Sequence, residues 1–338
     1  MGVIFMDYKE LVENARKCLG KCHGCPICNG VACRNTIPGP GAKGVGDTAI
    51  RNYQAWQTVR VVMDTLCEKR ETDTRLSLFG HSFAYPFFAG PVGAVAMHYS
   101  DKYNDVTYNA QLVPGCAESG ILAFTGDGMD AEVMRGATDA IKDCQGVGIP
   151  TVKPWNMQMI REKMDLVKAS GALAVAMDVD AAGLPFLKKF VPPAGSKSVE
   201  EMKEIIALTD VPFIVKGIMS VKGAVKAAKR ALRLSSFPTT GDASWTRALL
   251  RPKSCRKSRL LWAARSKSLL TAGSVPALMF SRLLPWAPMP SLLPDLLSML
   301  FMAAARKAYA ALLINWGLNS RIRWKCAGQL RSVKLRAR

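Results

Sequence analysis

Five short apolar runs decide the fold, and they are PFFA (86–89), ILAFT (121–125), IPTVK (149–153), LAVAMDV (173–179) and FIVK (213–216). Continuous apolar runs of this length are typical of strands that are buried on both faces, as in parallel sheets. The stretches between and after them have helical character, at 106–118, 131–144, 157–169, 199–208 and 221–229. This alternation predicts an α/β fold in which helices cover a parallel sheet.

The chain divides into three parts around these runs. Residues 1–70 hold predicted N-terminal helices and a Cys-rich loop, and residues 71–229 hold five strand–helix units. Residues 230–338 form a basic tail rich in Arg, Leu and Pro, without regular strand–helix order. We therefore expect the ordered core of the molecule to lie in the second part.

Positive charge is concentrated in the tail. The chain has 46 Lys and Arg against 26 Asp and Glu, a net charge of +20, and residues 230–338 carry +18 of it. Residues 1–229 have the balance of an ordinary globular protein, so the overall pI does not indicate a nucleic-acid partner. Asp295 and four prolines interrupt the most apolar stretch, 283–305, which argues against a membrane span.

The N-terminal part combines helices with clustered cysteines. Short and long helices are predicted over 7–19 and 47–69. The first ten residues lack the pattern of a signal peptide, so we expect a cytoplasmic protein with reduced thiols. The loop between the helices has the spacing C-x3-C-x2-C-x2-C-x4-C from Cys18 to Cys33. Such thiols can bind an iron–sulfur cluster or Zn, and the candidate ligands are Cys22, Cys25, Cys28 and Cys33. Structural or redox-active thiols are the alternative.

The residues around the five apolar runs resemble a known family. The segments are PFFAGPVGA (86–94), ILAFTGDG (121–128), PTVKPW (150–155), AVAMDVDAAGLP (174–185) and FIVKGIMS (213–220). In this order they are similar to the first five strands of the FMN-dependent α-hydroxy-acid dehydrogenases and oxidases, which include lactate and glycolate oxidases. The likeness covers roughly residues 1–229 and is closest to bacterial members with a Cys-rich N-terminus. It implies a (β/α)8 TIM barrel that binds FMN and acts on a small 2-hydroxy acid.

The resemblance also implies which residues form the site. The FMN-binding residues would be Pro91, Val92, Gly93, Gly126, Lys153, Asp178 and Lys216, with Trp155 on the substrate side. Lys216 matches the family lysine whose charge stabilises the anion of the reduced flavin. Lys153, Asp178 and Trp155 stand where many members have Gln, Thr and Tyr, so the sequence leaves the identity of the acid open. It also leaves open the electron acceptor and a homo-oligomeric state.

The catalytic motifs of the family are absent. Its sixth strand ends in S-N-H-G-G-R, which supplies the base His and a substrate Arg, and its seventh ends in D-G-G-I-R-S-G, which holds the FMN phosphate. Neither motif occurs in residues 230–338, and the three histidines, His23, His81 and His98, lie elsewhere. No catalytic residue is therefore predicted, and five units alone predict an incomplete barrel with an open edge.

A shift of reading frame near Lys229 and Arg230 explains the tail. One choice of codons for residues 236–243, read one base out of frame, spells V-V-S-N-H-G-G-R. A choice for residues 270–276 in the same frame spells D-G-G-I-R-S. Because the third base of these codons can be chosen, each match alone is weak evidence. Both motifs, however, emerge in one frame and in the order of the family. The alternative is a genuine, divergent basic domain.

Three functions remain in competition. The first is an FMN-dependent oxidoreductase of a lactate- or glycolate-like acid, impaired by loss of the catalytic motif. The second is a related FMN barrel that isomerises isopentenyl diphosphate, and the third is a non-catalytic flavin- or metal-binding protein with a basic interaction tail. Bound flavin separates the first two from the third, and flavin reduction by a hydroxy acid separates the first from the second.

Overall fold

The computed structural model of the 338-residue chain describes five regions of backbone. These are residues 13–34 (except 15, 21 and 26), residues 47–57, residues 75–228 (except 86 and 219), the strands 234–237, 267–271 and 291–293, and residues 333–334.

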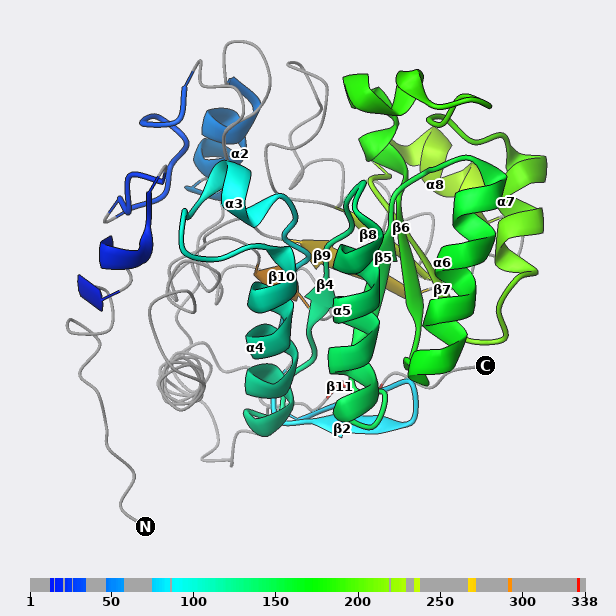
Figure 1. Ribbon diagram of the computed structural model, residues 1–338, viewed down its shortest axis with the longest axis horizontal. Coiled ribbons are helices and arrows are strands. Elements are labelled where there is room, and N and C mark those ends of the chain that lie inside the picture. The colour runs from blue at the N-terminus through cyan, green and yellow to red at the C-terminus, as the bar shows by residue number, and fades with distance from the viewer. Residues whose placement is uncertain are drawn as a thin grey trace, which may run out of the picture.

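A ring of eight parallel strands forms the centre of the molecule (Figure 1). The strands are β3 (Phe87–Ala89), β4 (Phe124–Thr125), β5 (Ile149–Val152), β6 (Val175–Asp178), β7 (Phe213–Lys216), β8 (Leu234–Phe237), β9 (Lys267–Thr271) and β10 (Ser291–Leu293). From β4 to β10 they pair in chain order, and β10 pairs in turn with β3. A parallel bridge between Ala89 and Ala123 joins β3 to the start of β4 and closes the ring. The predicted TIM barrel is confirmed.

The expectation of an open edge was wrong, because the tail supplies three strands. β8 pairs with β7, β9 with β8, and β10 bridges β9 and β3. Strand pairing uses backbone N–H and C=O groups, which every non-proline residue has, so the two edges left by β3 and β7 can be covered without the family's side chains. The strands predicted from the sequence end with β7, whereas the barrel continues through β8, β9 and β10.

The five predicted strands form close to the expected positions, and helices separate them. The helices are α3 (Val95–His98), α4 (Asp105–Glu118), α5 (Ala131–Asp143), α6 (Met157–Ser170), α7 (Val199–Ile206) and α8 (Val221–Ala228), with 3-10 turns η1 (Val179–Gly183) and η2 (Pro185–Lys189) after β6. Polar side chains cap the first turns of four of them, namely Asn104, Asp130, Asn156 and Ser198. α4, α5 and α6 lie side by side along the barrel (Figure 1).

Two apolar layers follow from the alternation of side chains along the strands. One layer faces the helices, and its strand residues include Phe87, Ala123, Val152, Val175 and Val215. The other faces the barrel interior, with Phe88, Leu122, Phe124, Ile149, Ala176 and Ile214. Since successive residues of a strand point to opposite sides, the interior face of each strand continues at every second residue up to its carboxyl end.

A hairpin covers the amino end of the barrel. β1 (Leu76–Leu78) pairs with β2 (His81–Phe83) across the loop residues Phe79 and Gly80, and β1 also pairs with β11 (Val333–Lys334). Both loop residues have positive φ, 51° and 81°, as a two-residue hairpin turn requires. Leu76, Leu78 and Phe83 join the interior layer. The hairpin therefore fills the end of the barrel opposite α3 (Figure 1).

The N-terminal segment contacts the loop after α3. The Gly20 N–H donates to the Tyr99 carbonyl at 3.1 Å, and the Ser100 hydroxyl donates to the Cys18 carbonyl at 2.5 Å. Residues 16–18 are helical, within the first predicted helix. α2 (Asp47–Gln57) begins where the second helix was predicted, and the remainder of that prediction lies outside the described residues.

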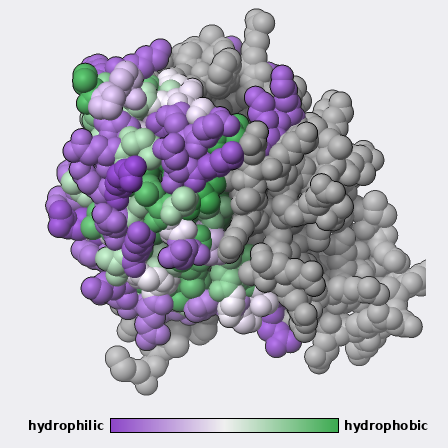
Figure 2. Space-filling view, turned by 90° about the vertical axis from the view of Figure 1, so that its right-hand side faces the viewer, coloured by the Kyte–Doolittle hydropathy of each residue, from purple (hydrophilic) through white to green (hydrophobic). Residues whose placement is uncertain are grey.

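The face of the molecule drawn in Figure 2 is mainly polar over its described residues. On the face turned toward the viewer in Figure 2, hydrophilic side chains cover most of the described surface, with apolar residues between them. This agrees with helices whose apolar stripes face the strands. None of the helices in the described part of the chain is long and apolar enough to cross a bilayer.

Candidate functional site at the carboxyl rim

Three charged side chains extend the interior face of neighbouring strands at the carboxyl end. Lys153 continues the interior positions Ile149 and Thr151, and Lys216 continues Ile214 in the same way. Asp178 continues Ala174 and Ala176. We call Lys153, Asp178 and Lys216 the rim row. In barrels of this kind, active sites lie at this end of the strands.

The rim row is held together by charge. Asp178 pairs with Lys216 across β6 and β7, and the Lys216 Nζ lies 2.5 Å from the Asp178 Oδ1 in an ion pair. Val152 pairs with Met177, so the next residues of these two strands, Lys153 and Asp178, are neighbours at the rim. Two cations therefore flank one carboxylate, and the row carries a net positive charge.

The row keeps Asp178 ionised. Burial raises the pKa of Asp178, but the Lys216 cation, the adjacent Asp180 side chain and the Lys153 cation lower it more, so that it falls from 3.8 to about 2. Lys216 is itself buried, with 7% of its surface exposed. A buried cation costs free energy unless a carboxylate lies close by, and Asp178 supplies this partner.

The loop after β3 lies against the loop after β4. Gly126 packs so closely on the Val92–Gly93 peptide that a Cβ at this position would lie 2.6 Å from the Val92 carbonyl carbon. A Cβ on Gly93 would lie 3.8 Å from the Lys153 Nζ. Pro91, Val92, Gly93, Gly126 and Lys153, which were predicted as one site, are thus neighbours.

A buried aspartate fixes the loop after β3. The Asp105 carboxylate accepts hydrogen bonds from the Ala94 N–H at 2.7 Å and the Val95 N–H at 3.0 Å. Ala94 has a left-handed backbone with φ 55°, which is uncommon for a residue with a side chain. Asp105 therefore holds the loop in a shape that it would not favour alone.

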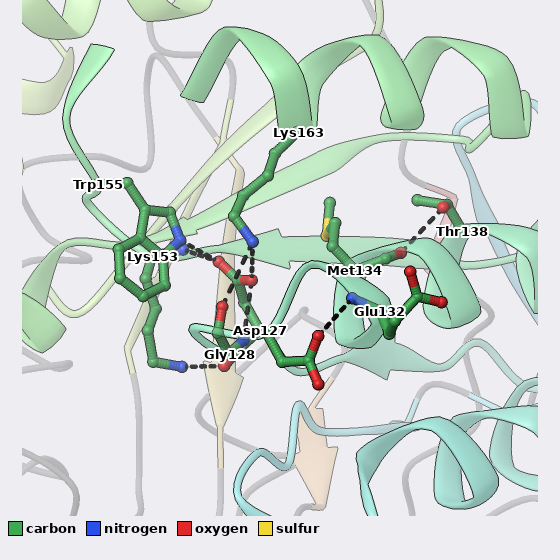
Figure 3. A network of polar contacts seen from close by, with 9 residues as sticks. Asp127, Gly128, Glu132, Met134, Thr138, Lys153, Trp155 and Lys163 are labelled. Atoms are coloured by element: carbon green, nitrogen blue, oxygen red, sulfur yellow. Dashed lines mark hydrogen bonds and ion pairs between the residues drawn. The ribbon is translucent and has the colours of Figure 1, made fainter. Parts of the chain in front are cut away.

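A second buried aspartate joins the loops after β4 and β5 (Figure 3). The Asp127 Oδ1 accepts from the Lys163 Nζ at 2.6 Å and from the Gly128 N–H at 2.9 Å. The Oδ2 accepts from the Trp155 indole N–H at 2.6 Å and from the Lys153 N–H at 2.8 Å. The Asp127 carbonyl accepts from the Lys153 Nζ at 2.6 Å. We call these five contacts the Asp127 clamp.

Trp155 belongs to this clamp. Its side chain is fully buried, its ring contacts Phe186 and Phe190 of the η2 region at centroid distances of 5.9 and 5.3 Å, and the Lys163 Nζ lies 5.3 Å from its ring. A ring enclosed in this way anchors loops. Its predicted position beside the substrate finds no support in this burial.

The metal prediction also gains no support. Within the described part of the chain, no group of three or more His, Cys, Asp and Glu side chains is arranged to hold a metal ion. Cys22, Cys25 and Cys28 are partly buried and Cys33 is buried.

Sequence reasoning missed Asp105, Asp127 and Lys163. Lys163 had a signal, because it lies on the same helical stripe as the buried residues Ile160, Met164 and Val167. A charged residue on an apolar stripe calls for a buried partner. Asp127 lies within the quoted TGDG motif, but its partners come from three separate segments that only the folded chain brings together.

One family model matches part of the barrel by sequence. Residues 40–189 match the sequence profile of the FMN-dependent dehydrogenases. No curated protein matched the chain by sequence. The match includes every predicted FMN-binding residue except Lys216, which lies beyond its end.

Solved structures with the same fold cover most of the chain. Mandelate oxidase has a TM-score of 0.75 at 15% identity, over 96% of this chain and 94% of its own. The same enzyme with (S)-4-hydroxymandelic acid has 0.75 at 14% identity, over 96% and 95%. A mutant of flavocytochrome b2 has 0.74 at 12% identity, over 87% and 78%. At these identities the likeness concerns the fold. The resemblance read from the strand motifs is confirmed, because residues 40–189 match the model of the FMN-dependent dehydrogenase family and the barrel has the fold of mandelate oxidase and flavocytochrome b2.

Proposed function

We propose that the chain is an FMN-dependent oxidoreductase of a small 2-hydroxy acid by descent, and that residues 71–229 retain the half of the site that holds the flavin ring. One observation carries the proposal. The rim row, Gly126 and residues 91–93 converge at the carboxyl end of a barrel whose residues 40–189 match the FMN-dependent dehydrogenases.

The residues at the rim fit the ring of FMN. The loop of residues 91–93 packs on Gly126 and brings its backbone close to the Lys153 amine, which leaves backbone groups and a cation beside the place proposed for the ring. The Lys216 cation, already desolvated, suits negative charge on the pyrimidine side of the ring, and Lys153 suits the ring edge or a substrate carboxylate. FMN held by these residues would supply the capacity to take up a hydride from a 2-hydroxy acid. The protein's part is to hold and orient the ring and to stabilise charge beside it.

The proton-transfer half of the site is proposed to be lost from this chain. His23 lies in the Cys-rich loop, His81 in β2 and His98 in α3, and none follows β8, where the resemblance predicts the base. Loss of a general base typically lowers a rate by about 10²–10⁴-fold. We therefore expect the chain to bind FMN weakly and to oxidise 2-hydroxy acids negligibly.

The positions of two tail strands support the shifted reading frame. β8 ends at Phe237, and the out-of-frame motif S-N-H-G-G-R would begin at the codons of residues 237 and 238. β9 ends at Thr271, and D-G-G-I-R-S would begin at the codons of residues 270 and 271. Both motifs would thus lie at the carboxyl ends of strands, where the functional residues of barrels of this kind are found.

Restoring the frame tests the proposal. The full chain and a version with one base corrected near codon 229 are purified, titrated with FMN and mixed anaerobically with lactate, glycolate and mandelate. The corrected chain should bind FMN and be reduced by at least one acid, whereas the present chain should do neither well. Ordinary lactate oxidation by the present chain would refute the shift. A corrected chain that binds FMN but is reduced by none of the acids would favour the isomerase or a non-catalytic flavin-binding protein, and one that binds no FMN would favour the non-catalytic, metal-binding alternative.

A further inference from the structure

We propose that Asp127 is a positioning residue that holds the Lys153 amine at the carboxyl rim. That this amine serves a flavin rests on the proposed function. The positioning itself rests on the contacts of the Asp127 clamp and is testable without flavin.

Asp127 has an acceptor set that only a carboxylate can provide. Its side chain is fully buried, and its two side-chain oxygens accept four hydrogen bonds, two from backbone N–H groups and two from side chains. Amides and alcohols cannot replace it, because an amide has one acceptor oxygen and a hydroxyl also donates. Charge-assisted bonds of this kind are shorter and stronger than neutral ones.

The four donors come from three segments of the chain. Gly128 belongs to the loop after β4, Lys153 and Trp155 to the loop after β5, and Lys163 to α6 (Figure 3). Trp155 carries the connection further, since its ring contacts Phe186 and Phe190 beyond β6. One carboxylate thus fixes the loops of three consecutive strands against one another.

The clamp holds Lys153 at both ends. Its backbone N–H donates to the Asp127 Oδ2, and its Nζ donates to the Asp127 carbonyl at 2.6 Å. The side chain therefore folds back over the loop after β4, and its amine lies near Gly93 instead of extending into solvent. Holding a lysine side chain in one position costs conformational entropy, and these two hydrogen bonds offset that cost.

Lys163 has a different place in the clamp and provides a matched control. It neutralises Asp127, with 7% of its own side chain exposed, and its amine donates to the Asp127 Oδ1 and the Gly128 carbonyl. Lys163→Met leaves the Asp127 Oδ2 and carbonyl contacts to Lys153 in place. Asp127→Asn leaves one acceptor oxygen for four donors. Both variants remove one side of a buried ion pair and lower stability. Only Asp127→Asn also weakens the bond to the Lys153 N–H, so that the loop after β5 can shift and draw the amine away from the Asp127 carbonyl.

The test measures the acylation rate of single lysines by mass spectrometry, in the full chain. In the wild type, Lys153 should react about tenfold more slowly than the exposed Lys142, because its charge-assisted bond must open first. Asp127→Asn should raise the Lys153 rate about tenfold, and Lys163→Met should leave it within about twofold of the wild type. Melting temperatures of both variants are recorded alongside.

Two results would overturn the positioning role. One is a wild-type Lys153 that reacts as fast as Lys142, which decides the matter even where Asp127→Asn fails to fold. The other is an equal rise in both variants, which would mean that the rate follows stability alone. FMN titration of the wild-type and frame-restored chains is the separate arm. If neither binds FMN, the proposed function fails, while the lysine rates still decide the positioning role.

Discussion

Gly126 is the position where a single methyl group should do the most damage. In Gly126→Ala the new Cβ would lie 2.6 Å from the Val92 carbonyl carbon and 3.0 Å from the Gly93 nitrogen, with the Val92 carbonyl oxygen closer still. These are backbone atoms of the loop after β3, which Asp105 holds by hydrogen bonds to Ala94 and Val95. The loop cannot give way without breaking those bonds. Overpacking typically costs about 1–3 kcal/mol, and we expect the upper end.

Gly128→Ala is the matched control in the same loop. Its Cβ would lie 3.2 Å from a methyl group of the Val133 side chain, which can rotate away. Both substitutions reduce the entropy of the unfolded chain equally, by about 0.4–1 kcal/mol, so their difference isolates the contact with the loop. Urea denaturation of the full chain should give Gly126→Ala a free energy of unfolding about 2 kcal/mol below that of Gly128→Ala. Equal values would refute the close approach of the two loops.

Three further predictions concern the rim. The pKa of Asp178 lies near 2 in the folded chain, below its ordinary 3.8, so the stabilisation by the ion pair with Lys216 is fully present above pH 3.8 and is lost as the pH falls through 2. This contribution to the free energy of unfolding is on the order of 2 kcal/mol. In urea denaturation at several pH values, Asp178→Asn should not show the loss of stability between pH 3.8 and 2 that the wild type shows. Asp105→Ala should lower the free energy of unfolding by about 1–3 kcal/mol, because the N–H groups of Ala94 and Val95 lose their acceptor, and urea denaturation with no loss would contradict this. In the frame-restored chain, Lys216→Met should lower the midpoint potential of bound FMN, since a cation beside the ring favours its reduced, anionic form. Spectroelectrochemistry measures this, and an unchanged potential would count against the role of Lys216.

The sequence predicted the first five strands because their apolar runs and the helical stripes between them are local signals. FIVK, for example, becomes a strand from Phe213 to Lys216, as expected, and its interior face follows from alternation alone. That Lys216 and Lys153 share one rim was also predictable, since the carboxyl ends of parallel strands meet there. The neighbouring position of Asp178 followed for the same reason.

The rest depends on contacts between distant segments. The Asp127 clamp joins residues up to 36 positions apart, and no local pattern encodes it. Trp155 was given a substrate-side position by resemblance, but the phenylalanines after β6 enclose its ring. The tail strands were missed because their pairing comes from the free edges of β3 and β7, and not from a pattern in the tail itself.

The way the barrel closes has a consequence for assembly. Residues 75–228 contribute five adjacent strands whose outer members, β3 and β7, each present one edge to the tail. Strand edges pair through backbone N–H and C=O groups. We therefore expect these two edges to accept other three-stranded parallel segments of suitable length. A separate polypeptide with in-frame sixth, seventh and eighth strands should therefore compete with the tail for these two edges. The five-strand unit is thus a candidate for fragment complementation, in which activity returns through exchange of strands between two chains.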